Sequence, residues 1–140
     1  MHRLQDPQQY RGKSGLNIIG HGVDLISVPR VVALLQRNDE FLHGWFSVEE
    51  LTELETTQAG PESIAGRVVA KEAIVKALGT GFNDSVSWQD VEVFATQSGE
   101  TRVVLSNGAR DAALEKGVNK VLVSITHTKE IAFGSAILVG

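Results

Sequence analysis

Glu72 and Lys76 are the first residues whose types and spacing suggest chemistry. They stand four positions apart in a segment of strong helix formers, so both side chains lie on one side of the expected helix. A carboxylate and an ammonium at this spacing form either a solvated ion pair, as on many ordinary helices, or a charged pair at the edge of a cleft. The helix alone is compatible with both interpretations, so support has to come from other segments.

Asp24 is the second candidate, because it interrupts the apolar segment Gly22-Val23-Asp24-Leu25-Ile26, which is typical of a β-strand. A carboxylate inside such a segment is costly to bury unless it is paired or bound to a ligand. The alternative is an acid at a strand end that faces water. Both interpretations of Asp24 stay open on this segment alone.

His127 ends a third segment, residues 120–128, which alternates like a β-strand. His127 shares a face with the valines and the isoleucine of this segment, whereas Ser124 and Thr128 lie on the opposite face. A histidine at a strand end is either a structural residue with satisfied hydrogen bonds or a functional group. This pattern is typical of both.

A long helix over residues 61–78 is the element that must position Glu72 and Lys76. Pro61 and Glu62 suit its first turn, where a missing N–H costs nothing and a negative charge meets the positive helix end. A glycine-rich stop at residues 79–81 supplies the backbone freedom that ends helices. Small residues on one side and larger apolar residues on another predict a central helix. The larger ones are Ile64, Val68, Val75 and Leu78, and the small ones are Gly66, Ala70, Ala73 and Ala77.

Capping residues, and changes in the spacing of apolar residues from a helical to a strand-like pattern, mark the remaining elements. Ser27 is a suitable cap for a helix that starts near residue 29, and Ser47 with Glu50 forms a capping box for another helix. Asn107 is a suitable cap for a helix over residues 108–116. The expected strands cover residues 16–26, 91–95, 101–105, 120–128 and 131–139, and a short helical passage lies within residues 38–46.

Composition sets the class of protein. The 140 residues, 42% hydrophobic and 21% charged, favour one globular domain over residues 16–140, preceded by a flexible polar tail at residues 1–15. Cysteine is absent from the sequence, which excludes disulfides, thiolate metal sites and a cysteine nucleophile. Without the apolar run of a signal peptide or of a membrane span, we expect a cytoplasmic protein with no membrane partner. A formal net charge of −4 argues against a general nucleic-acid binder.

Four segments together resemble the holo-[acyl-carrier-protein] synthases, the small trimeric group of 4′-phosphopantetheinyl transferases. Each segment is short, but they occur in the family's order and with similar intervals, from about residue 18 to the C-terminus. The segments are Gly22-Val23-Asp24, Ala70-Lys71-Glu72-Ala73 followed by Lys76-Ala77-Leu78-Gly79-Thr80-Gly81, Trp88 with Asp90-Val91-Glu92-Val93, and Ser124-Ile125-Thr126-His127-Thr128.

The resemblance implies an α+β fold, with a long central helix packed on a mainly antiparallel sheet, and it implies the family's reaction. Family members transfer the 4′-phosphopantetheine arm of coenzyme A to a serine of an apo-acyl carrier protein, release adenosine 3′,5′-bisphosphate and need Mg²⁺. Asp24 and Glu72 match the metal-binding carboxylates, which suits a cation that prefers oxygen ligands. Lys76 matches the lysine near the pyrophosphate. Either Glu72 or a metal-bound water would take the serine proton.

The resemblance also implies where coenzyme A is bound. Backbone N–H groups at residues 79–81 would suit a phosphate, and charge alone makes Arg67 and Lys71 candidates for the remaining phosphates. The coenzyme contacts that the resemblance implies are Lys76, Gly79, Thr80, Gly81, Ser124, His127 and Thr128.

Carrier docking and assembly follow from the same resemblance. Arg30 matches a basic position on the family's first helix, and Arg37, seven residues on, continues that side. The two arginines are either ordinary solvated charges or a local basic face for an acidic carrier protein. Glu40 departs from a wholly basic face. Family members are homotrimers with active sites between neighbouring subunits, so we expect a homotrimer here.

Three other functions compete with the transferase. A Mg²⁺-dependent phosphohydrolase would use the same carboxylates without a carrier protein. A non-catalytic module that binds carrier proteins or acyl-coenzyme A would keep its binding after loss of Glu72. A structural domain with solvated charges would show no response to Mg²⁺. The four segments together favour the transferase over all three.

Overall fold

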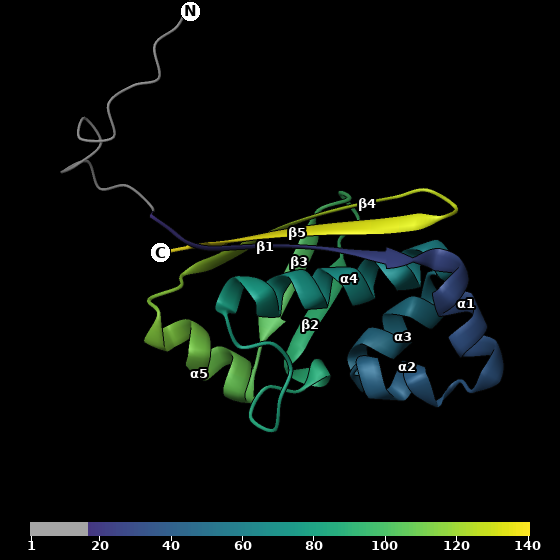
Figure 1. Cartoon of the computed structure of the whole chain (residues 1–140), viewed down its shortest axis with the longest axis horizontal. Coiled ribbons are helices and arrows are strands. Elements are labelled where there is room, and N and C mark those ends of the chain that lie inside the picture. The colour runs from purple at the N-terminus through teal and green to yellow at the C-terminus, as the bar shows by residue number, and fades with distance from the viewer. Residues whose placement is uncertain (1–16) are drawn as a thin grey trace, which may run out of the picture.

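The fold is α+β, as predicted, and Figure 1 shows a long helix lying across a sheet. The computed structural model describes residues 17–140, so the tail predicted at residues 1–15 lies outside the described residues. The elements are β1 (Ile18–Ser27), α1 (Val28–Arg37), α2 (Glu40–Trp45), α3 (Val48–Thr56), α4 (Pro61–Leu78), the 3₁₀ helix η2 (Trp88–Asp90), β2 (Val91–Ala95), β3 (Thr101–Leu105), α5 (Asn107–Glu115), β4 (Lys120–His127) and β5 (Ile131–Val139).

The main sheet has three antiparallel strands in the order β1-β5-β4, and β2 pairs with β3 in a separate hairpin. Asp24 of β1 lies opposite Gly134 of β5, which in turn lies opposite Ile125 of β4. The strand β5 therefore separates β1 from β4. Any site that uses side chains of both β1 and β4 has to span the width of this sheet.

Glycines let α4 lie unusually close to the sheet. A Cβ built on Gly22 or on Gly20 would collide with the backbone of α4, at the carbonyl of Ala73 or of Ala77. A Cβ on Gly134 would lie 3.1 Å from the carbonyl oxygen of Val69. The helix thus crosses β5 near residue 69 and reaches β1 near residues 73–77. This crossing brings the middle of α4 next to the strand that carries Asp24.

The helix starts confirm most of the predicted caps. The Ser27 hydroxyl accepts a hydrogen bond from the N–H of Arg30, and Ser47 and Glu50 form the predicted capping box of α3. The cap predicted at Asn107 is wrong by one residue, because Ser106 occupies that position. The amide of Asn107 instead donates to Asp90 Oδ1 at 2.8 Å.

The core surrounds α4, in which twelve of eighteen residues are buried. Its small-residue side packs on the sheet, and its larger apolar side chains fill the space toward α1, α3 and the β2–β3 hairpin. This arrangement confirms the prediction of a central helix. Among residues 17–140, the helices are all too short or too polar to cross a membrane.

Candidate active site

Asp24 and Glu72 come together where α4 crosses the edge strand β1. Asp24 lies two positions after Gly22 on β1, so the two residues face the same side of the sheet. Gly22 contacts α4, and the side chain of Asp24 therefore lies on the face that α4 covers. Glu72 precedes Ala73, the residue of α4 that touches Gly22. The two carboxyl groups are close enough to share a hydrogen bond. The structure therefore supports the paired interpretation of Asp24 over an acid that faces water alone.

The two carboxyl groups have pKa values that differ strongly. Burial, followed by the hydrogen bond to Asp24 and its negative charge, raises the pKa of Glu72 to about 8, although Lys76 opposes this shift. Burial alone would raise the pKa of Asp24 as well. The hydrogen bonds to Asp24 from Glu72 and the N–H of Leu25, together with the charge of Lys76, outweigh burial and lower its pKa. The proton that the pair shares therefore lies on Glu72, which donates to the Asp24 carboxylate.

Lys76 is the third charged group at this edge. Its Nζ lies 3.5 Å from Asp24 Oδ1 and donates to the carbonyl of Val23 at 3.2 Å. The side chain of Lys76 is 57% exposed, whereas that of Asp24 is 18% exposed. Lys76 thus reaches across to β1 and pairs with Asp24 rather than with Glu72 of its own helix. A cleft beside these residues stays a prediction.

This cluster suits a hard divalent cation. Two carboxyl groups that must share a proton repel each other when both are ionised, and a cation between them would relieve that repulsion. Mg²⁺ is commonly held by one or two carboxylates together with water and phosphate oxygens. Within residues 17–140, no three His, Cys, Asp or Glu side chains gather as a metal site. The pair therefore fits Mg²⁺ as a partial site that water and substrate oxygens complete.

Ser124 and His127 lie at the opposite edge of the sheet, on β4. Both residues line a hollow of about 580 Å³ between β4, the β2–β3 hairpin and the first half of α4. Ser63 and Lys120 add a hydroxyl and an ammonium to its wall. This hollow has the size of a ligand site and offers donors for an anionic ligand.

Within one chain, the two halves of the predicted site do not meet. The β1 half consists of Asp24 with Glu72 and Lys76 of α4, and the β4 half consists of Ser124 and His127. Two strand spacings, about 10 Å, separate the backbones of β1 and β4. A single subunit therefore presents two partial sites at opposite edges of its sheet.

Comparisons with known proteins identify the family of this chain. The sequence model of the 4′-phosphopantetheinyl transferase superfamily matches residues 20–133. The chain belongs to this superfamily. A holo-[acyl-carrier-protein] synthase of Alkaliphilus metalliredigens is 39% identical over 120 residues, which are 86% of this chain and 98% of that protein.

Solved structures of the superfamily share the fold. The holo-ACP-synthase of Plasmodium yoelii has 32% identity and a TM-score of 0.79 over 91% of this chain and 98% of that one. A holo-(acyl-carrier-protein) synthase from Bacillus anthracis, in complex with CoA (3′,5′-ADP), has 31% identity and a TM-score of 0.72. That alignment covers 88% of this chain and 97% of the other.

The turn at residues 79–81 does not offer its backbone N–H groups to a phosphate, although the sequence suggested that it would. Gly79 has φ +77° and ends the helix, and the N–H groups of Gly79, Thr80 and Gly81 all donate to carbonyls of Val75 or Lys76. These N–H groups are therefore not available to a phosphate, and the C-terminal end of a helix also repels anions. Coenzyme contacts at residues 79–81 stay a prediction, but they would have to use other atoms.

Thr128 has a structural role in the β4–β5 turn. Its hydroxyl accepts hydrogen bonds from the N–H groups of Glu130 and Ile131, both at 3.1 Å. The hydroxyl hydrogen can still be donated to a ligand. The coenzyme contact predicted for Thr128 therefore stays a prediction.

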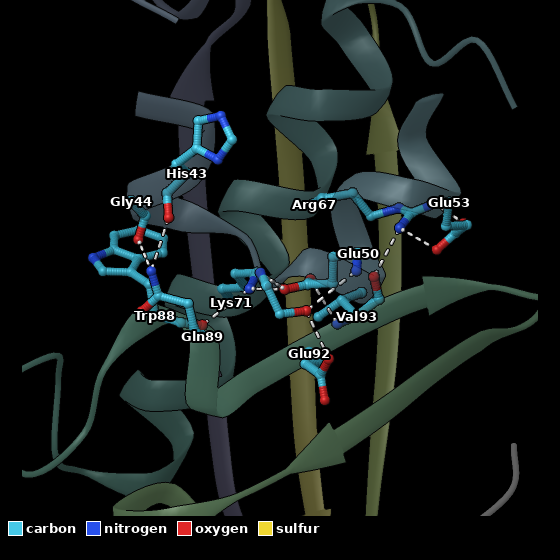
Figure 2. Close-up of polar contacts among 11 residues, drawn as sticks. His43, Gly44, Glu50, Glu53, Arg67, Lys71, Trp88, Gln89, Glu92 and Val93 are labelled. Atoms are coloured by element: carbon cyan, nitrogen blue, oxygen red, sulfur yellow. Dashed lines mark hydrogen bonds and ion pairs between the residues drawn. The ribbon is translucent and has the colours of Figure 1, made fainter. Parts of the chain in front are cut away.

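Lys71 was wrong as a candidate for phosphate binding, whereas Arg67 lines the hollow beside β4 but already has a carboxylate partner. Both are buried on the side of α4 that faces α3 and β2, where Arg67 pairs with Glu53 and Lys71 with Glu50 (Figure 2). Charge alone did not show this, because the four residues lie far apart in the sequence. The spacing contained a signal for this pairing. Two acids three positions apart on α3, Glu50 and Glu53, lie opposite two cations four positions apart on α4.

Arg30 and Arg37 are both exposed on α1 and, within residues 17–140, neither forms an ion pair. Two helical turns, about 10 Å, separate them along the axis. Glu40 forms two local hydrogen bonds with Asn38. The side-chain amide of Asn38 donates to the Glu40 carboxylate, and the side-chain oxygen of Asn38 accepts from the N–H of Glu40. The two arginines are thus free to meet an acidic surface.

The paired carboxyl groups predict that the metal-free fold loses stability as the pH rises through neutrality. Glu72 has a raised pKa, so between about pH 4.5 and 8 the folded protein binds more protons than the unfolded chain. At about 1.4 kcal/mol per pKa unit the full shift would correspond to about 5 kcal/mol. Because Glu72 is only half-buried, solvent screening should reduce the fall in stability to roughly 2–4 kcal/mol. The lowered pKa of Asp24 acts at lower pH, outside the window.

Urea unfolding in EDTA, repeated across this pH range, measures the effect. Glu72→Gln cannot titrate, so this variant should lose the part of the decline that comes from Glu72. Burial also raises the pKa of Glu50, and the decline that Glu50 contributes should remain in the variant. A wild-type protein whose stability rose steadily through the same window would contradict the shared proton.

Proposed function

We propose that this chain transfers the 4′-phosphopantetheine group of coenzyme A to a serine of an apo-acyl carrier protein. The observation that carries the proposal is the Asp24–Glu72 carboxyl pair beside the exposed ammonium of Lys76. The names of the relatives and the coenzyme complex of the Bacillus anthracis synthase support the same reaction. The products are the holo-carrier protein and adenosine 3′,5′-bisphosphate.

The reaction moves a phosphoryl group between two oxygens. The carrier serine oxygen bonds to the phosphorus that bears pantetheine, the bond from that phosphorus to the bridging oxygen breaks, and the serine loses its proton. Such a transfer asks the protein mainly for positioning and for compensation of negative charge. Lys76 is placed to stabilise the leaving phosphate. We assign the serine proton to Glu72, whose carboxyl group a bound cation would keep ionised and therefore able to accept it.

We further propose that Asp24 and Glu72 hold Mg²⁺. When bound, the cation would neutralise charge on the pyrophosphate of coenzyme A. Its support is the donor set itself: two adjacent carboxyl groups that would repel each other if both were ionised, of the kind that commonly holds Mg²⁺ together with water and phosphate oxygens. We assign coenzyme contacts to Lys76, to residues 79–81, and to Ser124, His127 and Thr128.

We also propose a homotrimer in which the β1 half of one subunit meets the β4 half of its neighbour. The separation of the two halves within one chain supports this arrangement, since a closed ring of identical contacts would join them. The outer face of the main sheet adds support, because it exposes a row of apolar side chains that a second copy would cover. These are Val23, Leu25, Leu122 and Ile131. We place the enzyme in the cytoplasm, as expected from the sequence.

Carrier docking is proposed at Arg30 and Arg37 of α1, which follows directly after the strand that carries Asp24. Replacing both arginines with glutamate should raise the KM for the carrier by about tenfold or more, because two attractive contacts with an acidic partner become repulsive. Binding of coenzyme A should change little. Steady-state kinetics with each substrate varied in turn separates the two effects, and an unchanged KM for the carrier would move the docking surface elsewhere.

Release of adenosine 3′,5′-bisphosphate distinguishes this function from its rivals. With coenzyme A and Mg²⁺, the nucleotide should appear only when an apo carrier is present. Release at the same rate without a carrier would indicate the phosphohydrolase. Tight binding of the carrier without any release would indicate the non-catalytic module.

A further inference from the structure

The Glu50–Lys71 pair is the most completely buried charged contact among the described residues. Lys71 Nζ lies 2.6 Å from Glu50 Oε1, and neither side chain has any solvent exposure. One helical turn earlier on α4, Arg67 pairs with Glu53 at 2.6 Å, and this second pair is partly exposed. Figure 2 shows the two pairs between α3 and α4, next to the edge of β2. Neither Glu50 nor Lys71 has a part in the proposed chemistry.

Hydrogen bonds fix the geometry of the buried pair from several sides. Glu50 also accepts from the N–H groups of Ser47 and Val93, both at 3.0 Å. Lys71 also donates to the carbonyl of Trp88 at 3.0 Å and lies over the ring of Phe46. The pair thus connects α4 with α3, η2 and β2. Its directional bonds allow one arrangement of these elements, whereas an apolar contact would tolerate sliding.

Stability is a weak explanation for such a pair. Removing two charges from water carries a penalty that often matches their attraction, so an apolar pair of similar volume is frequently as stable. A role in fixing geometry explains the pair better, because its bonds are directional and add to the apolar packing and the Arg67–Glu53 pair that also hold α4. The side that faces the sheet makes close contacts, in which Ala73 touches Gly22, Val69 touches Gly134 and Gly66 touches Ile125.

Rotation of α4 matters because Glu72 follows Lys71 directly. Neighbouring residues of a helix project about 100° apart, so one rotation moves both side chains together. On a helix with an outer radius of about 5–6 Å, a rotation of about 20° displaces a side-chain end by about 2 Å. A displacement of about 1 Å at a reacting group can reduce the rate about a hundredfold.

We propose that Glu50 and Lys71 are positioning residues that hold the carboxyl group of Glu72 against Asp24. This role rests on the proposed transferase function, in which Glu72 acts at the reaction centre. Neither Glu50 nor Lys71 touches substrate. Their contribution is the rotational setting of α4.

Lys71→Met tests this role, with Leu54→Ala as a control of similar destabilisation. Met keeps much of the volume of Lys71 but loses the ion pair. Leu54 is a buried core residue of α3, so its truncation weakens the fold without breaking that pair. Per folded molecule, Lys71→Met should lower kcat by about tenfold or more and change the KM for the carrier by less than about twofold. Leu54→Ala should leave kcat within about twofold of the wild type.

Mn²⁺ binding, followed by electron paramagnetic resonance in the presence of adenosine 3′,5′-bisphosphate, provides a readout that does not depend on turnover. The Kd for Mn²⁺ should rise about fivefold or more in Lys71→Met and stay unchanged in Leu54→Ala. If Lys71→Met does not fold, Glu50→Gln takes its place, because glutamine keeps the shape and an acceptor for the N–H of Val93.

The outcomes separate this role from the proposed function. Equal kcat and equal Mn²⁺ affinity in Lys71→Met and Leu54→Ala would overturn the positioning role while leaving the transferase intact. A wild-type protein that modifies no carrier would overturn the function instead. In that case, Mn²⁺ affinity alone would decide whether the pair positions Glu72.

Discussion

Replacing Glu72 with glutamine should lower the turnover number about a thousandfold while leaving the fold intact. A neutral amide is a poorer ligand for a hard cation than a carboxylate, and it cannot accept the serine proton. The fold should tolerate the change for a specific reason. In the metal-free protein the shared proton lies on Glu72, which donates to Asp24, and the NH₂ group of glutamine can make the same donation.

Glu115→Gln is the matched control, because it makes the same chemical change at an exposed position at the end of α5. Turnover is measured under saturating coenzyme A and carrier, and circular dichroism with urea unfolding checks the fold. The control should behave like the wild type. Undiminished turnover in Glu72→Gln would show that this carboxyl group is neither a metal ligand nor a base.

Mixing two inactive variants should restore activity if the site is shared between subunits. Asp24→Asn damages the β1 half and His127→Ala damages the β4 half, and each alone should be at least tenfold slower than the wild type. In randomly mixed rings, about one quarter of the junctions would combine an intact β1 half with an intact β4 half. Co-assembled variants should therefore recover about a quarter of the wild-type rate.

A second mixture controls for unspecific effects of co-assembly. Asp24→Asn and Glu72→Gln both damage the β1 half, so no junction formed from these two variants is intact. Their mixture should remain as slow as the faster of its components. Equal behaviour of the two mixtures, with no gain in either, would contradict a site shared between subunits.

Local patterns predicted the elements well, because the relevant signals lie within a few residues. The capping box at Ser47 and Glu50 and the glycine stop at Gly79 each set an element boundary through contacts with near neighbours. The cap at Asn107 failed for the opposite reason. A distant residue, Asp90, engages its amide, and Ser106 takes the cap position.

The local sequence patterns do not predict that Asp24 and Glu72 lie next to each other. Their proximity depends on how closely α4 approaches β1, which in turn depends on Gly22 facing Ala73. Both carboxylates were predicted from the resemblance to the family, because the residues alone left Asp24 undecided. Periodicity describes which side of an element a residue occupies, but it does not show which other element covers that side.

The buried pairs show the same limit for charges. Arg67 and Lys71 looked like free cations in the sequence, since their partners Glu53 and Glu50 stand 14 and 21 positions away. Only the packing of α3 against α4 shows that their charges are already used. The strand order β1-β5-β4 is another long-range property, and it places His127 far from Asp24 within one chain.

Intact-mass spectrometry of an apo-acyl carrier protein tests the proposed reaction most directly. The carrier is incubated with this protein, coenzyme A and Mg²⁺, beside samples that contain EDTA or the Glu72→Gln variant. We expect the carrier to gain the mass of one phosphopantetheine group in the complete mixture, and little or no gain in the other two. No gain with any of several apo carriers, while the protein is folded and binds coenzyme A, would contradict the transferase function.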